Sequence, residues 1–405
     1  MLSSPSPRYS VQRLAWSDPH LGTIDCPKRP MELVASFGSG LTRRAGDPPG
    51  IIWGVGDRGP NFKVKLARKL YGFEHLRSLE GAEGAKIMPR LDIGPAIAEL
   101  RVLDDRVELI RSIQLTNSDG SPVSGVPTPG GEHAKCEPAL SLDGEPIEPD
   151  PNGADTEGIA ALRDGSFFVG EEYGPALLKV GADGRVQSRW APGDGVLPEI
   201  AGKRQLNRGF EAISLSPDET WLYLAFQSPL AHPDKAAHEA ARHVRIWKLD
   251  ARSGNVAAQF LYPLDPPESF CRDYGKGKFE RSDIKVSEII AEAEDRLLVL
   301  ERGSETTKIY RTRLDAALAT GAEQIDISAR PTIEEISGAG GELPEVEKQL
   351  LISTDDHPEV GTDLESMVIL SPTELLLVSD NDFGVEGART GFWRVTFEEP
   401  VFGND

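Results

Sequence analysis

Short runs of apolar residues between turn residues are the dominant pattern along the chain. Most runs hold about five apolar residues and are bounded by Gly, Pro, Asp or Asn, as is typical of strands buried on both faces. The clearest example begins at Asp155 and Glu157, reverses at an Asp-Gly turn and ends at Glu172, just before a Gly-Pro corner. Helical periodicity is rare, and the best helix candidate spans 234–243. The pattern therefore predicts an all-β protein.

This arrangement of marked polar positions recurs along the chain. In each copy the second strand ends at a polar residue and an outer hairpin follows, and in every copy except the first, which has Gly40-Leu41, the first strand starts at an acidic residue. The strand-one positions are Glu157, Glu211, Glu288 and Glu365. The strand-two positions are Asp57, Glu172, Gln227, Glu301 and Asp380. Four-stranded units repeated at intervals of about 40 residues or more predict a β-propeller of four-stranded blades.

The repeat predicts five blades within a single domain that spans residues 1–405, with a sixth blade as the alternative. The approximate blade ranges are 31–115, 155–191, 210–262, 286–330 and 363–397. The last unit ends at its third strand, so we expect the N-terminal strand, residues 9–17, to supply the fourth and close the ring. Residues 61–94 and 116–154 are predicted insertions, and a sixth blade would have to lie in 61–94.

Composition and charge exclude several classes of function. The formal net charge of -21 argues against nucleic-acid binding, because neutralising phosphates needs clustered Lys and Arg. No apolar run is long enough for a membrane helix, so we expect no membrane partner. The N-terminus has no apolar signal region, which favours the cytoplasm, or export if a leader has been removed. We expect a monomer.

The repeat places the marked residues near one axis, because the innermost strands of a propeller line its central channel. The pattern leaves open whether the two sets lie at the same end of that channel. Several buried carboxylates need a cation, guanidinium partners or raised pKa values, and a Ca²⁺ ion takes six to eight oxygen ligands. Arg58, Arg208 and Arg302 stand beside marked acids. Alternatively, the acids bond backbone N–H groups at blade corners.

We therefore expect a Ca²⁺ site, or a site for another divalent metal, in the channel. The candidate ligands are Glu157, Glu172, Glu211, Glu288, Glu301, Glu365, Asp380 and Asp382.

Other motifs carry less weight. Residues 54–59 fit GxGxxG, but no βαβ unit surrounds them, so a blade strand is the favoured interpretation. No GxSxG elbow occurs. His232, His238 and His243 lack the HExxH spacing, and we expect them on a solvated helix face.

The motifs that flank these strands resemble a known family. They are Gly56-Asp-Arg-Gly-Pro60, Asp155-Thr-Glu157-Gly-Ile-Ala, Glu172-Tyr-Gly-Pro175, Gly209-Phe-Glu211-Ala-Ile, Gln227-Ser-Pro-Leu230, Leu298-Val-Leu-Glu301-Arg302, Leu364-Glu365-Ser and Ser379-Asp-Asn-Asp-Phe383. In order and spacing the chain resembles the bacterial phytase-like family, described as "esterase-like activity of phytase". The resemblance implies hydrolysis of phosphate or carboxylic esters.

The leading hypothesis is a metal-assisted hydrolase of such esters, acting on a small anionic substrate at the central channel. Glu157 or Glu211 would be the general base, and Arg58 or Arg302 would hold the anionic group. Further expected substrate contacts are Asp57, Tyr173, Arg208 and Gln227. Two alternatives remain: a non-catalytic propeller that binds a ligand or partner, and a sugar-lactone hydrolase.

Overall fold

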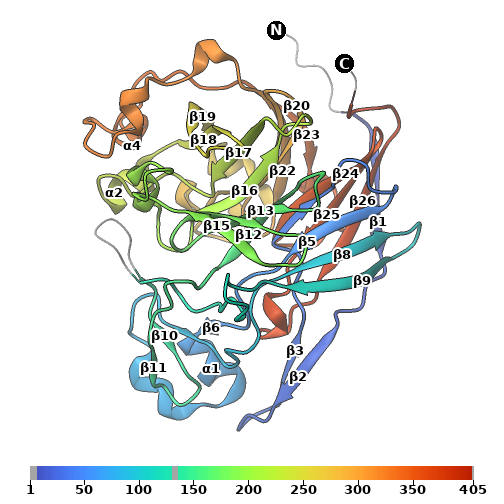
Figure 1. The fold of residues 1–405 in the computed structure, drawn as a ribbon, viewed down its shortest axis with the longest axis vertical. Helices are drawn as coiled ribbons and strands as arrows, with labels where there is room; N and C mark the ends of the chain where they lie inside the picture. Colours follow the sequence, from blue (N-terminus) through green and yellow to red (C-terminus); the bar gives the residue numbers. More distant parts are fainter. Residues whose placement is uncertain (1–6, 130–135, 404–405) are drawn as a thin grey trace.

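The computed structural model describes residues 7–129 and 136–403 and is dominated by antiparallel sheets. Five four-stranded antiparallel sheets share one plan, in which successive strands are neighbours in the sheet, except that the N-terminal strand completes the last sheet (Figure 1). Their innermost strands contact one another in cyclic order, so the sheets form a closed ring. This arrangement confirms the predicted β-propeller fold.

Each sheet of the ring runs from an innermost strand at the axis to an outermost strand at the rim. In that order, the first sheet is β4 (Gly40–Thr42), β5 (Ile51–Val55), β8 (Ala96–Val102) and β9 (Val107–Gln114). The second is β12 (Thr156–Ala161), β13 (Phe167–Glu171), β14 (Ala176–Val180) and β15 (Val186–Trp190). The third is β16 (Phe210–Leu215), β17 (Trp221–Phe226), β18 (His243–Asp250) and β19 (Val256–Pro263).

The fourth sheet is β20 (Lys285–Ala293), β21 (Arg296–Arg302), β22 (Thr307–Arg313) and β23 (Lys348–Ser353). The predicted range 286–330 stops short of β23, because a long connection with little strand pattern separates β22 from it. The fifth sheet is β24 (Leu364–Ser371), β25 (Glu374–Ser379), β26 (Gly391–Phe397) and β1 (Tyr9–Leu14). The N-terminal strand therefore completes the last sheet, as the sequence predicts.

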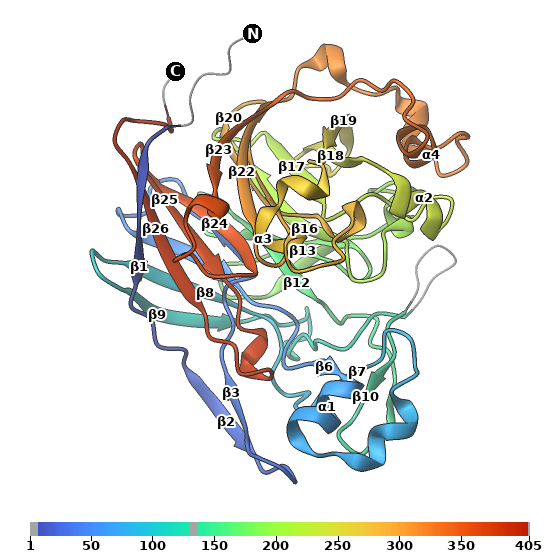
Figure 2. The ribbon, with the colours of Figure 1, turned by 180° about the vertical axis from the view of Figure 1, so that it is seen from behind.

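Two smaller structures lie outside the ring. Strands β2 (His20–Ile24) and β3 (Met31–Val34) form a separate hairpin, so the first ring sheet begins later than residue 31. The predicted insertions build a second small sheet from β6 (Phe62–Lys63), β7 (Lys86–Ile87), β10 (Ala139–Leu140) and β11 (Pro146–Ile147), next to α1 (Val64–Tyr71). Its strands are two residues long and β7 pairs with β10 in parallel, so it lacks the plan of a ring sheet (Figure 2).

Helices are short in the described part of the chain. They include α2 (Lys235–Ala240), α3 (Cys271–Tyr274) and α4 (Ile333–Gly338). The helix expected at 234–243 is present as α2, and Asp234 caps it by accepting a hydrogen bond from the Ala237 amide. The histidine prediction is wrong, because the side chains of His232, His238 and His243 are buried. None of these helices is long and apolar enough to cross a membrane.

Close approach of the innermost strands shapes the centre of the ring. A Cβ atom on Gly158 would collide with the carbonyl oxygen of Glu211 on the next innermost strand. In the same way, a Cβ atom on Gly40 would meet the carbonyl oxygen of Glu157. Glycine at these positions lets neighbouring inner strands pack backbone to backbone, which leaves little space in the middle of the channel.

We expect removal of residues 1–14 to destabilise the ring strongly. Strand β26 would lose its outer partner along six residue pairs, from Tyr9–Phe397 to Leu14–Phe392, and Leu14 would leave the core. At about 0.5–1.5 kcal/mol for each hydrogen bond, the loss in the free energy of unfolding is on the order of several kcal/mol. Urea unfolding followed by tryptophan fluorescence measures it.

A chain that lacks only residues 1–7 keeps β1 and is the matched control. Equal midpoints for the full chain and the chain that starts at residue 15 would show that β1 does not close the ring.

Candidate functional site

The predicted site residues gather at one end of the ring, which we call the mouth. It is the end at which the innermost strands begin and the second strands finish. Antiparallel pairing places the two together, as in the pairs Thr156–Glu171 and Phe210–Phe226. The two predicted sets of side chains therefore share one end of the channel.

A β-bulge at the start of four innermost strands directs one side chain into the mouth. The pairing register shifts between Thr156 and Gly158, and equivalent shifts occur in β16, β20 and β24. Each shift leaves one extra residue, and a bulge of this kind re-aims a side chain. The extra residues are Glu157, Glu211, Ser287 and Glu365.

The register corrects the prediction for the fourth sheet by one residue on each strand. Ser287, and not Glu288, occupies the bulge position of β20. On β21, Arg302 pairs with Lys285 at the position that Glu172 holds in the second sheet, and Glu301 lies one residue earlier. The fourth sheet therefore contributes a serine and an arginine to the mouth where the sequence pattern predicts two glutamates.

The side chain of Glu301 lies away from the mouth, in a separate buried network. Its carboxylate accepts hydrogen bonds from Tyr262 Oη at 2.8 Å, from Lys348 Nζ at 2.7 Å and from the Asp265 amide at 2.7 Å. Tyr262 and Lys348 lie in the outermost strands of the third and fourth sheets, and Asp265 lies just after the first of these strands. Glu301 is thus fully occupied there, and the structure does not bring it to the other predicted metal ligands.

One side of the mouth is acidic. Asp57, Asp155 and Glu157 offer carboxylate oxygens that all lie within 4.8 Å of one another. Asp155 is 2% exposed, and its Oδ1 atom has no hydrogen-bond partner among the described residues. Sequence reasoning assigns Asp155 no role, although Asp155 opens the clearest motif of the chain. Three converging carboxylates, one of which has an unsatisfied oxygen, form a donor set that suits a hard cation.

The electrostatics of this acidic side point to a cluster that Arg58 compensates only in part. Burial raises the pKa of Asp57 well above its usual value, and the neighbouring Asp155 raises it further. Burial, followed by the charge of Asp155, also raises the pKa of Glu157 and the pKa of Glu172 well above their usual values. Carboxylates held this close must bind protons or a cation, because the ionised forms repel one another in a poorly solvated site.

Arg58 is anchored beside the acidic side. Its guanidinium lies 3.1 Å from Glu137 and 3.6 Å from Asp155, and it stacks on the ring of Tyr173 at 4.6 Å. Burial lowers the pKa of Arg58, but Asp155 and Glu137 outweigh burial and raise it. Its Nε and Nη1 atoms make no hydrogen bond within the described residues. Glu137 comes from a loop without strand pattern, so sequence reasoning misses it.

The opposite side of the mouth is basic. Arg302 donates to Ser287 Oγ at 2.9 Å and to Glu365 Oε1 at 2.8 Å. Burial lowers the pKa of Lys285, and the adjacent Arg302 and Arg208 lower it further. Arg208 also donates to the carbonyl oxygen of Ser282. Three cationic side chains therefore lie close together, which favours an anionic group near them.

Glu211 lies between the two sides. Burial raises its pKa, although the neighbouring Lys285 and Arg302 act in the opposite direction. The carboxylate of Glu211 in turn raises the pKa of Glu157 and of Glu172 across the mouth. Glu211 is thus the group that faces both the acidic cluster and the basic cluster.

The remaining predicted residues border the mouth. Asp380 accepts hydrogen bonds from Ser36 Oγ at 2.5 Å and from the Gly38 amide at 3.0 Å, and burial followed by Asp382 raises its pKa to about 6. Asp382 is exposed. Gln227 is buried, and its side-chain oxygen has no hydrogen-bond partner in the part of the chain that the structure describes.

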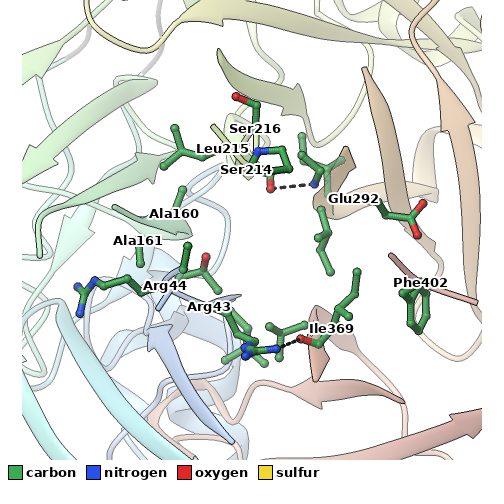
Figure 3. Close-up of a pocket in the computed structure, with 18 of the residues that line it drawn as sticks. Arg43, Arg44, Ala160, Ala161, Ser214, Leu215, Ser216, Glu292, Ile369 and Phe402 are labelled. Carbon is green, nitrogen blue, oxygen red and sulfur yellow. Dashed lines mark hydrogen bonds between the residues drawn. The ribbon is translucent and has the colours of Figure 1, made fainter. Parts of the chain in front are cut away.

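A cavity of 420 Å³ lies at the other end of the ring, away from the carboxylates (Figure 3). Residues such as Ala160, Leu215, Ile369 and Phe402 give it mostly apolar walls. Its charged groups are already bound, since Arg43 donates to the Ile369 and Leu370 carbonyl oxygens and Glu292 accepts from Arg311. The converging carboxylates and the unsatisfied oxygen of Asp155 lie at the mouth and not in this cavity.

Glu288 lies in the channel between the mouth and this cavity. It is completely buried, and its carboxylate accepts hydrogen bonds from the Leu41 amide at 3.2 Å and the Ile289 amide at 3.0 Å. Burial raises its pKa well above the usual value, although these two bonds act in the opposite direction. Equivalent positions hold Gly158, Ala212 and Ser366. Glu288 therefore bonds the Leu41 amide of another innermost strand and the amide of the next residue in its own strand.

The raised pKa of Glu288 gives a test of its role. A protein that contains an acid with a raised folded-state pKa loses stability as pH rises above the unfolded-state pKa of that acid. The reason is that the unfolded chain releases the proton at a lower pH than the folded chain. The glutamine in Glu288→Gln has no such proton, so the stability of the variant lacks this dependence on pH. We expect the melting temperature of the variant, relative to the native chain, to rise by about 2 °C or more between pH 5 and pH 8. Calorimetry in the presence of chelator measures the difference.

Repeating the scan with Ca²⁺ separates the two roles of Glu288. If Glu288 were a metal ligand, the variant would lose stability relative to the native chain at pH 8 when calcium is present.

The chain is similar to several known proteins. It matches the family model described as "Phytase-like: Esterase-like activity of phytase" over residues 36–383. It is 26% identical over 236 residues to an uncharacterized secreted protein of Arthroderma benhamiae, a match that covers 50% of this chain and 44% of that protein. The chain thus aligns with less than half the length of this relative.

Two solved structures are similar at a low level. The PQQ-bound aldose sugar dehydrogenase of Streptomyces coelicolor is 12% identical, with a TM-score of 0.33 and coverage of 98% of this chain and 100% of that chain. The virginiamycin B lyase of Staphylococcus aureus is 12% identical, with a TM-score of 0.33 and coverage of 96% and 100%. Similarities of this size say nothing about the chemistry of the mouth.

The family match has a different weight, because residues 36–383 include both the acidic and the basic side of the mouth. The match begins at Ser36, which binds Asp380, and ends at Phe383, just beyond it. The chain therefore belongs to the phytase-like family whose description is "Esterase-like activity of phytase".

Proposed function

We propose that this protein is a metal-assisted hydrolase of phosphate or carboxylic esters and that the mouth of the ring is its active site. One observation carries the proposal: three carboxylates converge within 4.8 Å, with a buried unsatisfied oxygen on Asp155, and a cluster of cationic side chains faces them. Family membership supports ester hydrolysis as the type of reaction.

Asp57, Asp155 and Glu157 are the residues that would hold a divalent cation. Carboxylate oxygens are hard ligands, and the mouth holds more carboxylates than cationic side chains. Ca²⁺ is therefore the preferred candidate. A divalent cation supplies Lewis-acid polarisation of an ester oxygen when it is bound. Glu172 lies next to this set and adds negative charge to it.

The basic side would hold the anionic part of the substrate. Lys285, Arg302 and Arg208 lie close enough for each to affect the others' ionisation, and a phosphate or carboxylate placed among them would relieve that repulsion. Arg58, with two N–H groups that lack a hydrogen-bond partner among the described residues, offers a further donor on the acidic side. A substrate that spans the mouth would thus meet both halves.

Glu211 is the proposed general base. It faces both halves of the mouth, and its raised pKa brings its basicity closer to neutral pH, which suits the transfer of a proton from an attacking water molecule. Glu157 is the less suitable candidate for this role, because it belongs to the set that would hold the cation.

We expect calcium-dependent turnover of at least one ester. The panel is nitrophenyl phosphate, phytate, nitrophenyl acetate and a sugar lactone, each tested with chelator and with added Ca²⁺. Glu211→Gln should lower kcat by about 10²- to 10⁴-fold, the usual contribution of a general base. Asp57→Asn should abolish the increase in melting temperature that Ca²⁺ gives the native chain.

Asp143→Asn changes an exposed aspartate in a turn outside the mouth and is the matched control. Absence of turnover of every ester at every calcium level would overturn the catalytic proposal. A calcium-dependent rise in melting temperature would then support a binding protein, and turnover of the lactone alone would indicate a lactonase.

Lys285→Gln tests the basic side separately. A charge-assisted hydrogen bond is worth about 1.5–3 kcal/mol, so we expect KM for an anionic ester to rise about tenfold or more. The value of kcat/KM for a neutral ester should change little. Steady-state kinetics on nitrophenyl phosphate and nitrophenyl acetate provide the comparison, and equal effects on both substrates would contradict the assignment.

A further inference from the structure

A second cluster of reactive side chains lies outside the mouth, at the edge of the third sheet. His243 begins β18, Ser337 lies in α4, and Glu345 lies in the connection from α4 to β23. The Nδ1 atom of His243 is 2.7 Å from Ser337 Oγ, and its Nε2 atom is 2.7 Å from Glu345 Oε2. A hydroxyl, an imidazole and a carboxylate thus form one hydrogen-bonded chain. Helices α2 and α4 lie side by side in this region (Figure 2).

The direction of these hydrogen bonds follows from one further contact. The backbone amide of Arg242 donates to Ser337 Oγ at 2.7 Å. Because that amide is a donor only, the proton of the Ser337 hydroxyl is free to point to His243 Nδ1, which then acts as the acceptor. In this tautomer Nε2 of His243 carries the ring proton and donates a hydrogen bond to Glu345. This is the polarity that a serine nucleophile with its general base requires.

The three residues border a pocket of 250 Å³ that also has cationic walls. Arg242 and Arg281 line it together with Gly340 and Gly341. Burial lowers the pKa of Arg281, and the neighbouring charge of Arg242 lowers it further. Arg281 donates to the carbonyl oxygens of Leu264 and Asp265, which fix its position. On a chain of net charge -21, two guanidinium groups at one small pocket favour an anionic ligand.

We propose that Ser337, His243 and Glu345 form a second hydrolytic site, for small esters that carry a carboxylate or phosphate group. Arg242 would bind that anionic group, and the limited volume of the pocket restricts the site to short substrates. This proposal does not depend on the function of the mouth, because none of the mouth residues takes part in it and no cation is needed.

The reaction would follow the usual course of a serine hydrolase. Ser337 Oγ attacks the ester carbonyl carbon while its proton passes to His243 Nδ1. The bond from that carbon to the leaving oxygen breaks, and His243 returns the proton to the departing alcohol. Water then hydrolyses the acyl group from Ser337 by the same two proton transfers, which releases the acid and restores the hydroxyl.

A fluorophosphonate probe tests the site in the full chain. Attack by Ser337 would form a phosphorus–oxygen bond and expel fluoride, so intact-mass analysis should show one adduct, and peptide mapping should place it on Ser337. The reaction is run with excess chelator, which removes any cation-dependent activity of the mouth. A serine protease treated in parallel confirms that the probe is active.

Variants identify the roles within the site. Ser337→Ala should lose the adduct, whereas Ser253→Ala, which changes an exposed serine, should keep it. Glu345→Gln should slow labelling by about a hundredfold, because the imidazole would lose its carboxylate partner. Arg242→Gln should raise KM for a short anionic ester about tenfold or more without a matching change in kcat.

Unfolding curves establish that each variant is folded before labelling. If the folded native chain gives no adduct on Ser337 while the protease is labelled, the three residues only tie α4 to β18 and the proposal is wrong. Equal labelling rates for the native chain and Glu345→Gln would also overturn it.

Discussion

One extra residue at the start of four innermost strands determines which side chains reach the mouth. Without the bulge, strict alternation would direct the side chain of Glu157 or Glu211 to a face of its sheet and away from the open end. The bulge has this effect only because the ring is closed. Glycines such as Gly158 allow the inner strands to approach, and β1 completes the last sheet. Closure and bulge together bring groups from separate sheets into one cluster.

The fold was predictable from the sequence because it rests on a local pattern that recurs in every unit. The mouth was predictable only in part. Pairs such as Ser287 and Glu288, or Glu301 and Arg302, are adjacent in the chain, and only the pairing register decides which member faces the axis. The repeated acidic pattern predicts that the acidic member of each pair, Glu288 or Glu301, faces the axis. In the fourth sheet that choice is wrong, and the error hides the change from an acidic to a basic side of the mouth.

Loop residues set a second limit on prediction. Glu137 holds Arg58 in place from a segment with no strand pattern, and Glu345 reaches His243 from the long connection between β22 and β23. Contacts of this kind depend on where the ring places the loops, and neither spacing nor composition encodes that. His232, His238 and His243 show the same effect. The local sequence suggests a solvated helix, but α4 packs against α2 and all three histidines are buried.

The division of the mouth into two halves would link proton binding to the binding of the proposed cation. Asp57, Glu157 and Glu172 all have raised pKa values because burial and mutual repulsion oppose their ionisation. A cation among them would remove that repulsion, so each ion that binds must displace protons, and affinity must increase with pH. The basic half has the opposite preference, since repulsion among Lys285, Arg302 and Arg208 is relieved by an anion. An ester held between a cation and these cationic side chains would relieve the repulsion in both halves at once.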